Sequence, residues 1–263
     1  MFSASATRTR AIPIDKARQM LAERMTPLTA SVMYPAEASL GRVAAQDIHS
    51  KIDLPRTHNA AVDGFGVSAK TLADAPSTAF KIVGVARAGH PYQGVIGVGE
   101  AIEIYTGAVM PEGPNCVAMH EDCQRNGDQV VINKTLKPGS NMRPPGENLL
   151  KGETVITKGQ RITAALIGQI AATGHKHIAV QRTLKVGLLS TGDEIIESGN
   201  QLKNGQIFDS NRPMLRALLS DPMLDVSDRG IVSDDLKALV AAYEEALKTH
   251  DVVISSGGAS DGI

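Results

Sequence analysis

Two short stretches near the C-terminal end of the sequence combine hydroxyl groups, glycines and acids directly after apolar runs. The first is "STGDE", Ser190 to Glu194, which follows "VGLL". The second is "SSGGASDG", Ser255 to Gly262, which follows "VVI". Glycine lets backbone N–H groups approach an anion closely, and serine and threonine hydroxyls add donors at the same place. The two stretches therefore predict a cradle for a phosphate or a similar oxyanion.

The acids Asp193 and Glu194 complicate this prediction, because carboxylates repel phosphate. A magnesium ion would remove the repulsion, since Mg²⁺ accepts one or two carboxylates together with phosphate oxygens. In the alternative interpretation Asp193 caps a turn and Glu194 is simply solvated, and the spacing alone does not separate the two. Neither loop matches the P-loop or the dinucleotide-binding fingerprint, so the common nucleotide-binding folds are not supported.

The chain from residue 183 onward has the pattern of a parallel α/β sheet. Two apolar β-type runs are separated by two periodic helical segments, with Asn211 as the expected cap of the first and Ser233 as the expected start of the second. The order strand, helix, helix, strand favours parallel strands joined by right-handed crossovers. Ligands of such sheets bind beyond the carboxyl ends of the strands, where both polar loops fall. The expected strands are 183–190 and 251–256, and the expected helices are 211–221 and 233–250.

The sequence before residue 183 indicates further domains. Residues 54–142 contain many short β-type runs separated by turns rich in glycine, proline and asparagine, which predicts a β-rich insert. Residues 1–53 and 143–182 flank the insert, and we expect them to form one discontinuous, mixed domain. The predicted fold class is α/β and β multidomain: a mixed extended N-terminal domain, a β-rich insert, and an incomplete parallel α/β domain at 183–263. In the mixed domain, the segment 15–32 is expected to begin with a helix, and a second helix is expected at 163–174.

Three polar motifs of the insert have simple structural interpretations. Asp63 precedes a glycine, and this pair is a tight-turn signal typical of a hairpin. Thr106 opens a Thr-Gly-Ala sequence after an apolar run, which is typical of a turn in a β domain. Cys116, His120 and Cys123 are all potential metal ligands, but their spacing fits no common zinc pattern. We interpret the two cysteines as reduced thiols of a cytosolic protein.

Composition excludes several classes of partner. The chain has 263 residues, a net charge of −1, 3% aromatic residues and no tryptophan. Neither a basic surface nor aromatic stacking platforms are expected, so nucleic acid is excluded as the main partner. The longest apolar runs fall short of the about 20 residues that a membrane span needs. The N-terminus lacks the apolar core of a signal peptide and is interpreted as a frayed tail rather than a targeting segment. We expect a cytoplasmic protein.

Taken in order, the motifs resemble one family, the molybdopterin molybdenumtransferases of the MoeA and gephyrin E-domain group. The resemblance covers residues 12 to 263. Six stretches in register carry it, which is far more specific than any single one. They are "PRTHNAAVDGFGV", "TGAVMPEGPNCVAMHED", "RPPGENLLKGETVITKGQRI", "VGLLSTGDEI", "NGQIFDSN" and "SSGGASDG".

The resemblance implies a reaction, its substrates and its partners. Adenylylated molybdopterin would be cleaved in the presence of molybdate and Mg²⁺, releasing AMP and giving molybdenum cofactor. The family's members are homodimers whose site lies between the α/β domain of one subunit and the N-terminal domains of the other. A molybdopterin adenylyltransferase is the further partner that this reaction implies.

The resemblance also assigns roles to individual residues. It implies catalytic roles for Asp63, Thr106 and Glu194, and metal contacts for Asp63, Glu194 and Asp234. The residues implied to bind the pterin cofactor are Ser190, Thr191, Gly192, Asp193, Asp209, Ser210, Asn211, Ser256, Gly257 and Gly258.

Three departures from the family pattern leave other functions open. Asn148 stands where the family has an acid, Asp261 stands where the glycine loop carries an apolar residue, and the α/β domain stops at Ile263 before its usual end. One alternative is therefore a non-catalytic cofactor-binding or scaffold homologue. The other is a competence-damage-type nucleotide pyrophosphatase, which shares the α/β domain. That class places the domain near the N-terminus, whereas here about 180 residues precede it.

Overall fold

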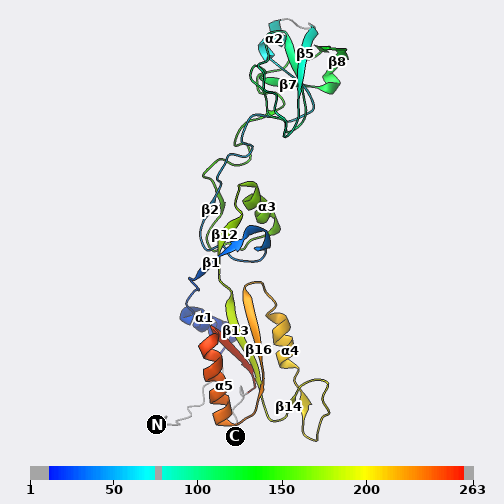
Figure 1. Ribbon diagram of the computed structural model, residues 1–263. Coiled ribbons are helices and arrows are strands. Elements are labelled where there is room, and N and C mark those ends of the chain that lie inside the picture. The colour runs from blue at the N-terminus through cyan, green and yellow to red at the C-terminus, as the bar shows by residue number, and fades with distance from the viewer. Residues whose placement is uncertain (1–11, 75–78, 258–263) are drawn as a thin grey trace. The chain divides into compact units, whose positions relative to one another are not determined.

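The computed structural model describes residues 12–74 and 79–257 and divides into two compact units (Figure 1). One unit is Met33–Val180. The other joins Met1–Val32 to Gln181–Ile263. Gly258 and Asp261 lie outside the described residues. No helix within the described ranges is both long enough and apolar enough to cross a membrane.

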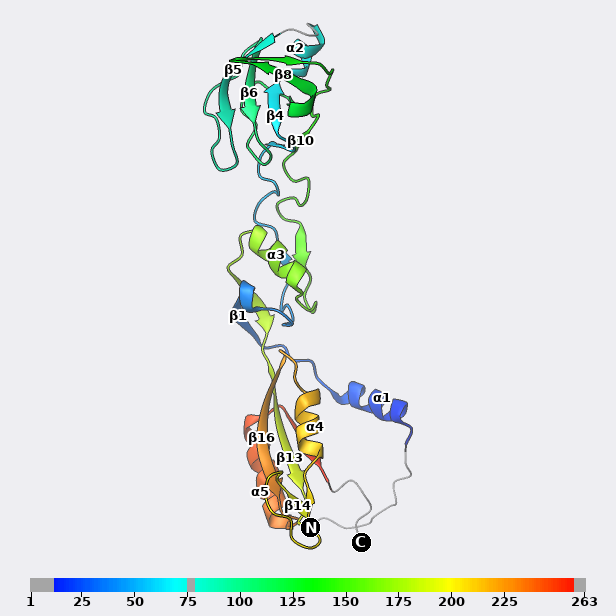
Figure 2. The same cartoon turned by 90° about the vertical axis from the view of Figure 1, so that its right-hand side faces the viewer.

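The C-terminal unit is built on a three-stranded parallel sheet in the order β16-β13-β17. The central strand β13 is almost fully buried, and Val186 pairs with Val226 on one side and with Val252 on the other. The chain moves from β13 to one edge and then crosses to the opposite edge. Right-handed crossovers then place the two helices on opposite faces, as Figures 1 and 2 show. The elements are β13 Leu184–Thr191, α4 Asn211–Leu218, β16 Leu224–Val232, α5 Leu236–Thr249 and β17 Val252–Ser256.

The edge strand β16 was not expected. The predicted order of strand, helix, helix, strand is therefore wrong, because β16 lies between the two helices. Asp225, Asp228 and Arg229 interrupt its apolar residues, because an edge strand exposes part of its surface to water. Since β16 extends to Val232, α5 begins at Leu236 and not at Ser233. The cap of α5 is Asp235, whose carboxylate accepts a 2.9 Å bond from the amide of Ala238.

The start of α4 also differs from the prediction. The N-cap position is Ser210, whose side chain makes no capping hydrogen bond, and Asn211 is the first helical residue. The capping bond comes one residue earlier, from the Asp209 carboxylate, which accepts a 3.1 Å bond from the amide of Arg212. Before α4, Ile195–Ile196 (β14) and Ile207–Phe208 (β15) form a short parallel pair. Helix α1, Ile14–Arg24, confirms that the segment 15–32 begins with a helix.

The mixed part of the other unit packs small strands against one helix. The expected helix after residue 163 is confirmed, since the Thr163 hydroxyl accepts a bond from the amide of Leu166 and Gly174 follows with a φ of +85°. Ile156, Ile170 and Val180 lie in its core. The elements are β1 Ser31–Pro35, the 3₁₀ turn Ala36–Ala38, β2 Ile48–His49, β11 Thr154–Ile156, α3 Ala164–Ala172 and β12 His177–Gln181.

The β-rich part contains a six-stranded sheet in the order β7-β4-β6-β5-β9-β8. Figure 2 shows β5, β6 and β4 side by side in it. The two short strands β3 and β10 form a separate antiparallel pair. In the sequence, β3 precedes the strands of this sheet and β10 follows them. The strands are β3 Asn59–Ala60, β4 Gly64–Val67, β5 Ala79–Ala86, β6 Glu100–Ile104, β7 Cys116–Met119, β8 Cys123–Asn126, β9 Gln129–Ile132 and β10 Met142–Arg143, with the 3₁₀ turn His120–Asp122.

This part is not purely β, because it includes helix α2, Ala69–Asp74. The segment "SAKTLAD" carries good helix formers, and Ser68 and Asn115 accept bonds from the first amides of the helix. Both faces of the sheet are buried. Phe65 lies in one core cluster, and Ile102 and Val117 lie in another, as the alternation of side chains along strands requires.

The hairpin interpretation of Asp63 and Gly64 is wrong. Gly64 opens β4 and pairs with Ile104 on one side and Met119 on the other. A Cβ atom at Gly64 would lie 1.8 Å from the carbonyl oxygen of Ala118, so glycine is required by the close approach of β7. Asp63 is thereby fixed at the end of the sheet, directly before β4.

Candidate functional site

In the β-rich part, Asp63 and Thr106 form a directly bonded pair. The Thr106 amide and the Thr106 hydroxyl both donate to the same oxygen, Oδ1 of Asp63, each at 2.7 Å. Thr106 lies in a turn in which the Ala108 amide donates to the Tyr105 carbonyl, and Gly107 supplies the φ of +82° that the turn needs. The Oδ2 atom of Asp63 has no hydrogen-bond partner among the described residues.

The environment of Asp63 favours its charged form. The two hydrogen bonds from Thr106 lower the pKa of the Asp63 carboxyl below its ordinary value, and the nearby His120 lowers it further. Both Asp63 and Thr106 are exposed. The pair is therefore an ionised carboxylate held in place by a hydroxyl and open to solvent, which suits contact with a cation or a proton-bearing substrate.

In the C-terminal unit, the two polar loops meet at the carboxyl ends of β13 and β17. The Ser190 and Ser256 hydroxyls lie 3.0 Å apart, and the Thr191 hydroxyl donates to the Ser256 carbonyl at 3.4 Å. Gly257 has a φ of +106°, and a Cβ atom there would lie 2.5 Å from both the carbonyl and hydroxyl oxygens of Thr191. Gly257 thus lets the second loop lie directly against the first.

Beneath this contact is a charge cluster that we call the Arg212 cluster, formed by the buried Arg212 and Asp209 together with Asp228 and Glu197, which reach the surface. Arg212 is only 8% exposed and Asp209 only 4%. The Arg212 guanidinium donates to Asp209 at 3.0 Å, to Glu197 at 2.8 Å and to Asp228. One buried cation therefore joins the first turn of α4 to the loop after β14 and to strand β16.

The hydrogen bonds of this cluster outweigh the cost of burying its charges. Burial raises the pKa of the Asp209 carboxyl, but hydrogen bonds from the Ser190 hydroxyl and from Arg212 bring the pKa below its ordinary value. Burial lowers the pKa of Arg212, but its three carboxylate partners raise the pKa above its ordinary value. The side chains of Ser190 and Asp209 are thus engaged within the protein, and they order the loops that carry the exposed Ser210 and Asn211.

The acids of the Thr-Gly-Asp-Glu loop have different surroundings. The Asp193 carboxylate accepts a 3.1 Å bond from the Asp234 amide, which gives it a structural role at the start of the segment leading into α5. The carboxylates of Glu194 and Asp234 are exposed, and neither has an ion-pair partner among the described residues. A Cβ atom at Gly192 would lie 2.6 Å from Glu194 Oε2, so Gly192 leaves room for this acid.

The three acids implied as metal contacts are divided between the two units. Asp63 belongs to the unit Met33–Val180, whereas Glu194 and Asp234 belong to the other. Across the described residues, no group of three or more histidine, cysteine, aspartate or glutamate side chains is arranged to hold a metal ion. Cys116 and Cys123 are free thiols, and burial raises the pKa of each to about 11.

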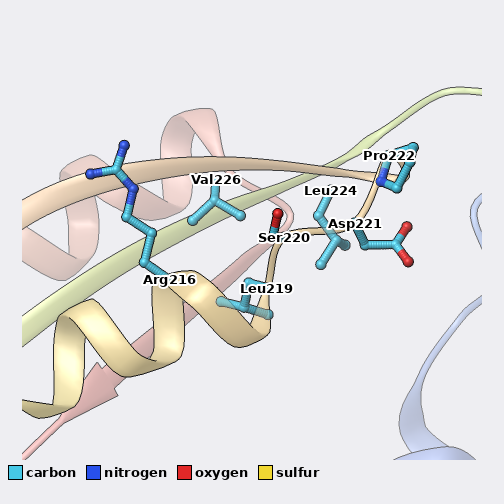
Figure 3. A pocket seen from close by; sticks show the side chains of 7 residues that line it. All are labelled: Arg216, Leu219, Ser220, Asp221, Pro222, Leu224 and Val226. Carbon is cyan, nitrogen blue, oxygen red and sulfur yellow. The ribbon is translucent and has the colours of Figure 1, made fainter.

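A cavity of about 420 Å³ lies at the opposite end of the parallel sheet from these loops. Figure 3 shows Arg216 and Leu219 from α4 and its end, with Leu224 and Val226 from β16, among its lining residues. Because Leu224 opens β16, this cavity lies at the amino end of the strands, away from the predicted chemistry. Asn148 is exposed and lines another cavity of about 420 Å³, and its backbone N–H donates to the Leu54 carbonyl.

The residues of the Arg212 cluster other than Asp209 were missed by sequence reasoning. Arg212 lies three residues after Asp209, the i to i+3 spacing of helix neighbours, and this was the signal that could have found it. Asp228 could not have been placed without β16. Gly258 cannot be placed, because it falls outside the described residues.

Comparison with known proteins covers both units. Residues 12–174 match the model of the MoeA N-terminal region (domain I and II), and residues 187–262 match the model of a probable molybdopterin binding domain. The molybdopterin molybdenumtransferase of Haemophilus influenzae is 34% identical over 252 residues, which is 95% of this chain and 62% of that protein. The enzyme of that name from Staphylococcus aureus is 31% identical over 254 residues, or 95% and 60% respectively. The chain thus spans about three fifths of the length of these relatives.

Solved structures with the same fold are molybdopterin biosynthesis MoeA proteins. One from Pyrococcus horikosii superposes with a TM-score of 0.84 at 34% identity, over 95% of this chain and 64% of that one. Another, from Pyrococcus horikoshii OT3, gives a TM-score of 0.88 at 29% identity, over 94% and 67%. These likenesses confirm the predicted fold class of α/β and β multidomain.

Proposed function

Because the chain belongs to the MoeA family, we propose that it acts in molybdenum cofactor biosynthesis, inserting molybdate into adenylylated molybdopterin with release of AMP. One observation supports this proposal: the two polar loops meet at the carboxyl ends of β13 and β17, inside the stretch that matches the molybdopterin-binding model. The names of the relatives support the same reaction. They favour neither the non-catalytic scaffold nor the nucleotide pyrophosphatase.

In this proposal the cradle binds the phosphate end of the pterin. The Thr191 hydroxyl donates to the Ser256 carbonyl and the Gly192 amide donates to the Val232 carbonyl, so both residues support the cradle by holding its loops in place. Ser210 and Asn211 are exposed at the N-terminus of α4, where the helix dipole favours an anion. Ser190 and Asp209 support the cradle without contacting the anion, because their side chains are buried and bonded to Ser256 and Arg212. Gly258 is part of the proposed cradle on the resemblance alone.

Asp63 and Thr106 are the proposed catalytic pair of the β-rich part. Since both bonds from Thr106 go to Oδ1, the Oδ2 atom of Asp63 is left to contact a reacting group. The lowered pKa keeps this carboxylate charged at neutral pH, so it can accept a proton or a cation but not donate a proton. Thr106 fixes the orientation of the carboxylate, which reduces the entropic cost of reaching the reactive geometry.

A magnesium ion is also part of the proposal. Glu194 and Asp234 fit it in number and type, because Mg²⁺ is usually held by one or two carboxylates together with water and phosphate oxygens. When bound, Mg²⁺ would polarise the phosphoanhydride and offset the charge that develops on AMP. The bond from the Asp234 amide to Asp193 keeps the loop that carries Glu194 in one position.

Three further statements rest on the resemblance. We infer that the protein is a homodimer, that it is cytoplasmic, and that it receives its substrate from a molybdopterin adenylyltransferase. Light scattering of the purified native polypeptide tests the first statement, and a mass of one subunit would contradict it. Cell fractionation and co-purification test the other two.

The reaction itself is tested by AMP release from adenylylated molybdopterin, using the native polypeptide from its source. We expect release that rises with molybdate, requires Mg²⁺ and disappears in Asp63→Ala. If the protein binds the pterin but releases no AMP under any of these conditions, the transferase proposal is wrong. Asn148→Asp then distinguishes the causes, because recovered activity would show that this departure had removed a needed charge.

A further inference from the structure

In the sheet of the β-rich part, four chemically active side chains lie at the same end of four adjacent strands. The strands β7, β4, β6 and β5 are consecutive neighbours, with Gly64 paired to Met119 and Ile104, and Ile104 paired to Ala86. The residue just beyond each of these paired ends therefore falls in a single row. Across the four strands, in order, the row is His120, Asp63, Tyr105 and Arg87.

Tyr105 contacts both cation-forming members of this row. The Arg87 guanidinium carbon lies 5.6 Å from the centre of the Tyr105 ring, and the His120 ring meets it edge-on at 6.2 Å. The Tyr105 hydroxyl donates a 2.9 Å bond to Glu103, which fixes the position of the ring. Phe65 packs on His120 at 5.1 Å. The Tyr105 ring thus contacts Arg87 and His120 from the strand that also leads into Thr106.

The charges in this region are not all satisfied within the protein. Arg125 is paired with Glu103 at 3.0 Å. Arg87, by contrast, has no carboxylate partner within the described ranges, and no ring nitrogen of His120 is hydrogen-bonded there. Both side chains are exposed. An arginine without a carboxylate, held by cation–π contact beside a catalytic carboxylate, is suited to receive an anion.

The proposed reaction gives this arrangement a purpose. Asp63 is ionised, and an anionic substrate at its Oδ2 atom would be repelled. The positive charge of Arg87, two strands away from Asp63 in the row, offsets part of that repulsion, and the His120 ring on the adjacent strand can donate a hydrogen bond to the anion. The donors of Arg87 form a planar fork that matches two oxygens of a tetrahedral oxyanion.

We propose that Arg87 and His120, held by Tyr105, form an oxyanion subsite beside Asp63 and Thr106. The subsite rests on the proposed function and binds either molybdate or a phosphate group of the pterin substrate, which share tetrahedral oxyanion chemistry. Arg87 and His120 contact the anion directly. Tyr105 is a positioning residue, because it acts through the two side chains that it contacts.

Calorimetric titration of the native polypeptide with molybdate alone, and separately with inorganic pyrophosphate, tests the subsite. We expect Arg87→Gln to weaken binding about tenfold and His120→Phe, which keeps the ring packing, to weaken it several-fold. The matched control is Lys81→Gln, which removes the same charge from an exposed position near the start of the same strand, about 20 Å away. If the variants lose affinity for molybdate only, the subsite binds molybdate. If they lose affinity for pyrophosphate only, it binds a phosphate group of the pterin substrate.

Two tyrosine variants test the positioning role. Tyr105→Phe keeps the ring but removes the hydroxyl that bonds Glu103 and Arg87, so we expect only a small loss of affinity. Tyr105→Ala should lose as much affinity as the double variant of Arg87 and His120 does. The proposal is wrong if Arg87→Gln and His120→Phe both stay within twofold of the Lys81→Gln control while thermal unfolding shows them folded. AMP release separates the two proposals. If Arg87→Gln releases AMP with unchanged KM values for both molybdate and adenylylated molybdopterin, the subsite is wrong but the function stands. If the protein binds anions through Arg87 but releases no AMP, the subsite stands and the function is wrong.

Discussion

The Asp63–Thr106 pair and the Arg212 cluster each hold a carboxylate with a pKa below its ordinary value, but at different depths in the fold. Asp63 is exposed, and among the described residues its carboxylate is bonded by Thr106 alone, through one of its two oxygens. Asp209 is 4% exposed, and Ser190 and Arg212 bond it. The first arrangement leaves charge available to a ligand, whereas the second uses charge to join α4, β13 and β16.

This contrast separates residues that perform chemistry from those that support it. A buried carboxylate balanced by a buried arginine cannot reach a substrate, but removing either partner leaves the other charge uncompensated. An exposed carboxylate stabilises the fold little, because water solvates it in any state. We therefore expect substitutions in the Arg212 cluster to act on stability and substitutions at Asp63 to act on turnover.

The largest effect on stability is expected from Arg212→Met. The methionine fills similar space but leaves Asp209 and Asp228 without their cation, so we expect a loss of about 3–5 kcal/mol in the free energy of unfolding. Urea denaturation measures it. Arg216→Met is the control, since Arg216 is one turn further along α4, has a side chain that is 64% exposed, and lies 3.9 Å from Asp228. Equal losses in the two variants would remove the distinction between a buried and a surface charge.

Asp63→Asn should show the opposite pattern. The amide keeps the size of the side chain but not its charge, so we expect AMP release to fall about a hundredfold or more while the urea midpoint stays unchanged. Asp122→Asn is the matched control, because Asp122 lies in the same β-rich part but is paired with Lys134. Activity within a few-fold of the unchanged protein in Asp63→Asn would mean that the exposed carboxylate is not used.

The elements with strong local signals were predictable from the sequence. The helix after Thr163, the buried strand β13 and the partly buried strand β17 follow from capping residues and apolar runs. The edge strand β16 was not predictable in this way, because Asp225 and Asp228 break its pattern, and strand identity there depends on pairing with β13.

The same distinction between local signals and tertiary contacts applies to the polar residues. Asp63 and Thr106 were found by motif, but their direct bond depends on strands β4 and β6 becoming neighbours, which no local pattern encodes. Arg212 was missed because an arginine in a helix is usually exposed, and only its three carboxylate partners make its burial favourable.

A smaller effect is expected at Gly257, where the two polar loops touch. Alanine there would be strained by the φ of +106° and would place its Cβ 2.5 Å from two oxygens of Thr191. Gly199→Ala is the control, because Gly199 has a φ of +93° and open space around its Cβ position. We expect Gly199→Ala to cost about 1 kcal/mol from backbone strain and Gly257→Ala about 2 kcal/mol more from the clash. Equal costs would mean that the loops separate easily.

The smallest effect concerns acid stability and compares Asp228 with Asp225 on the same strand. Burial raises the pKa of Asp228, but the Gly230 amide and Arg212 outweigh it and hold the pKa below its ordinary value of 3.8. The unfolded chain therefore takes up the proton first as pH falls. The stabilisation is complete above the unfolded pKa and is lost as pH falls through the folded one.

Asp228→Asn should consequently flatten the decline in the free energy of unfolding below about pH 4, measured by urea denaturation at a series of pH values. Asp225→Asn should leave that slope unchanged, because the Asp225 side chain is exposed and has no arginine partner in the described part of the chain. If the two variants have the same slope, Asp228 is not held by Arg212 in solution. The cluster would then resemble the exposed Asp63 pair, and its carboxylates would be free to contact a ligand.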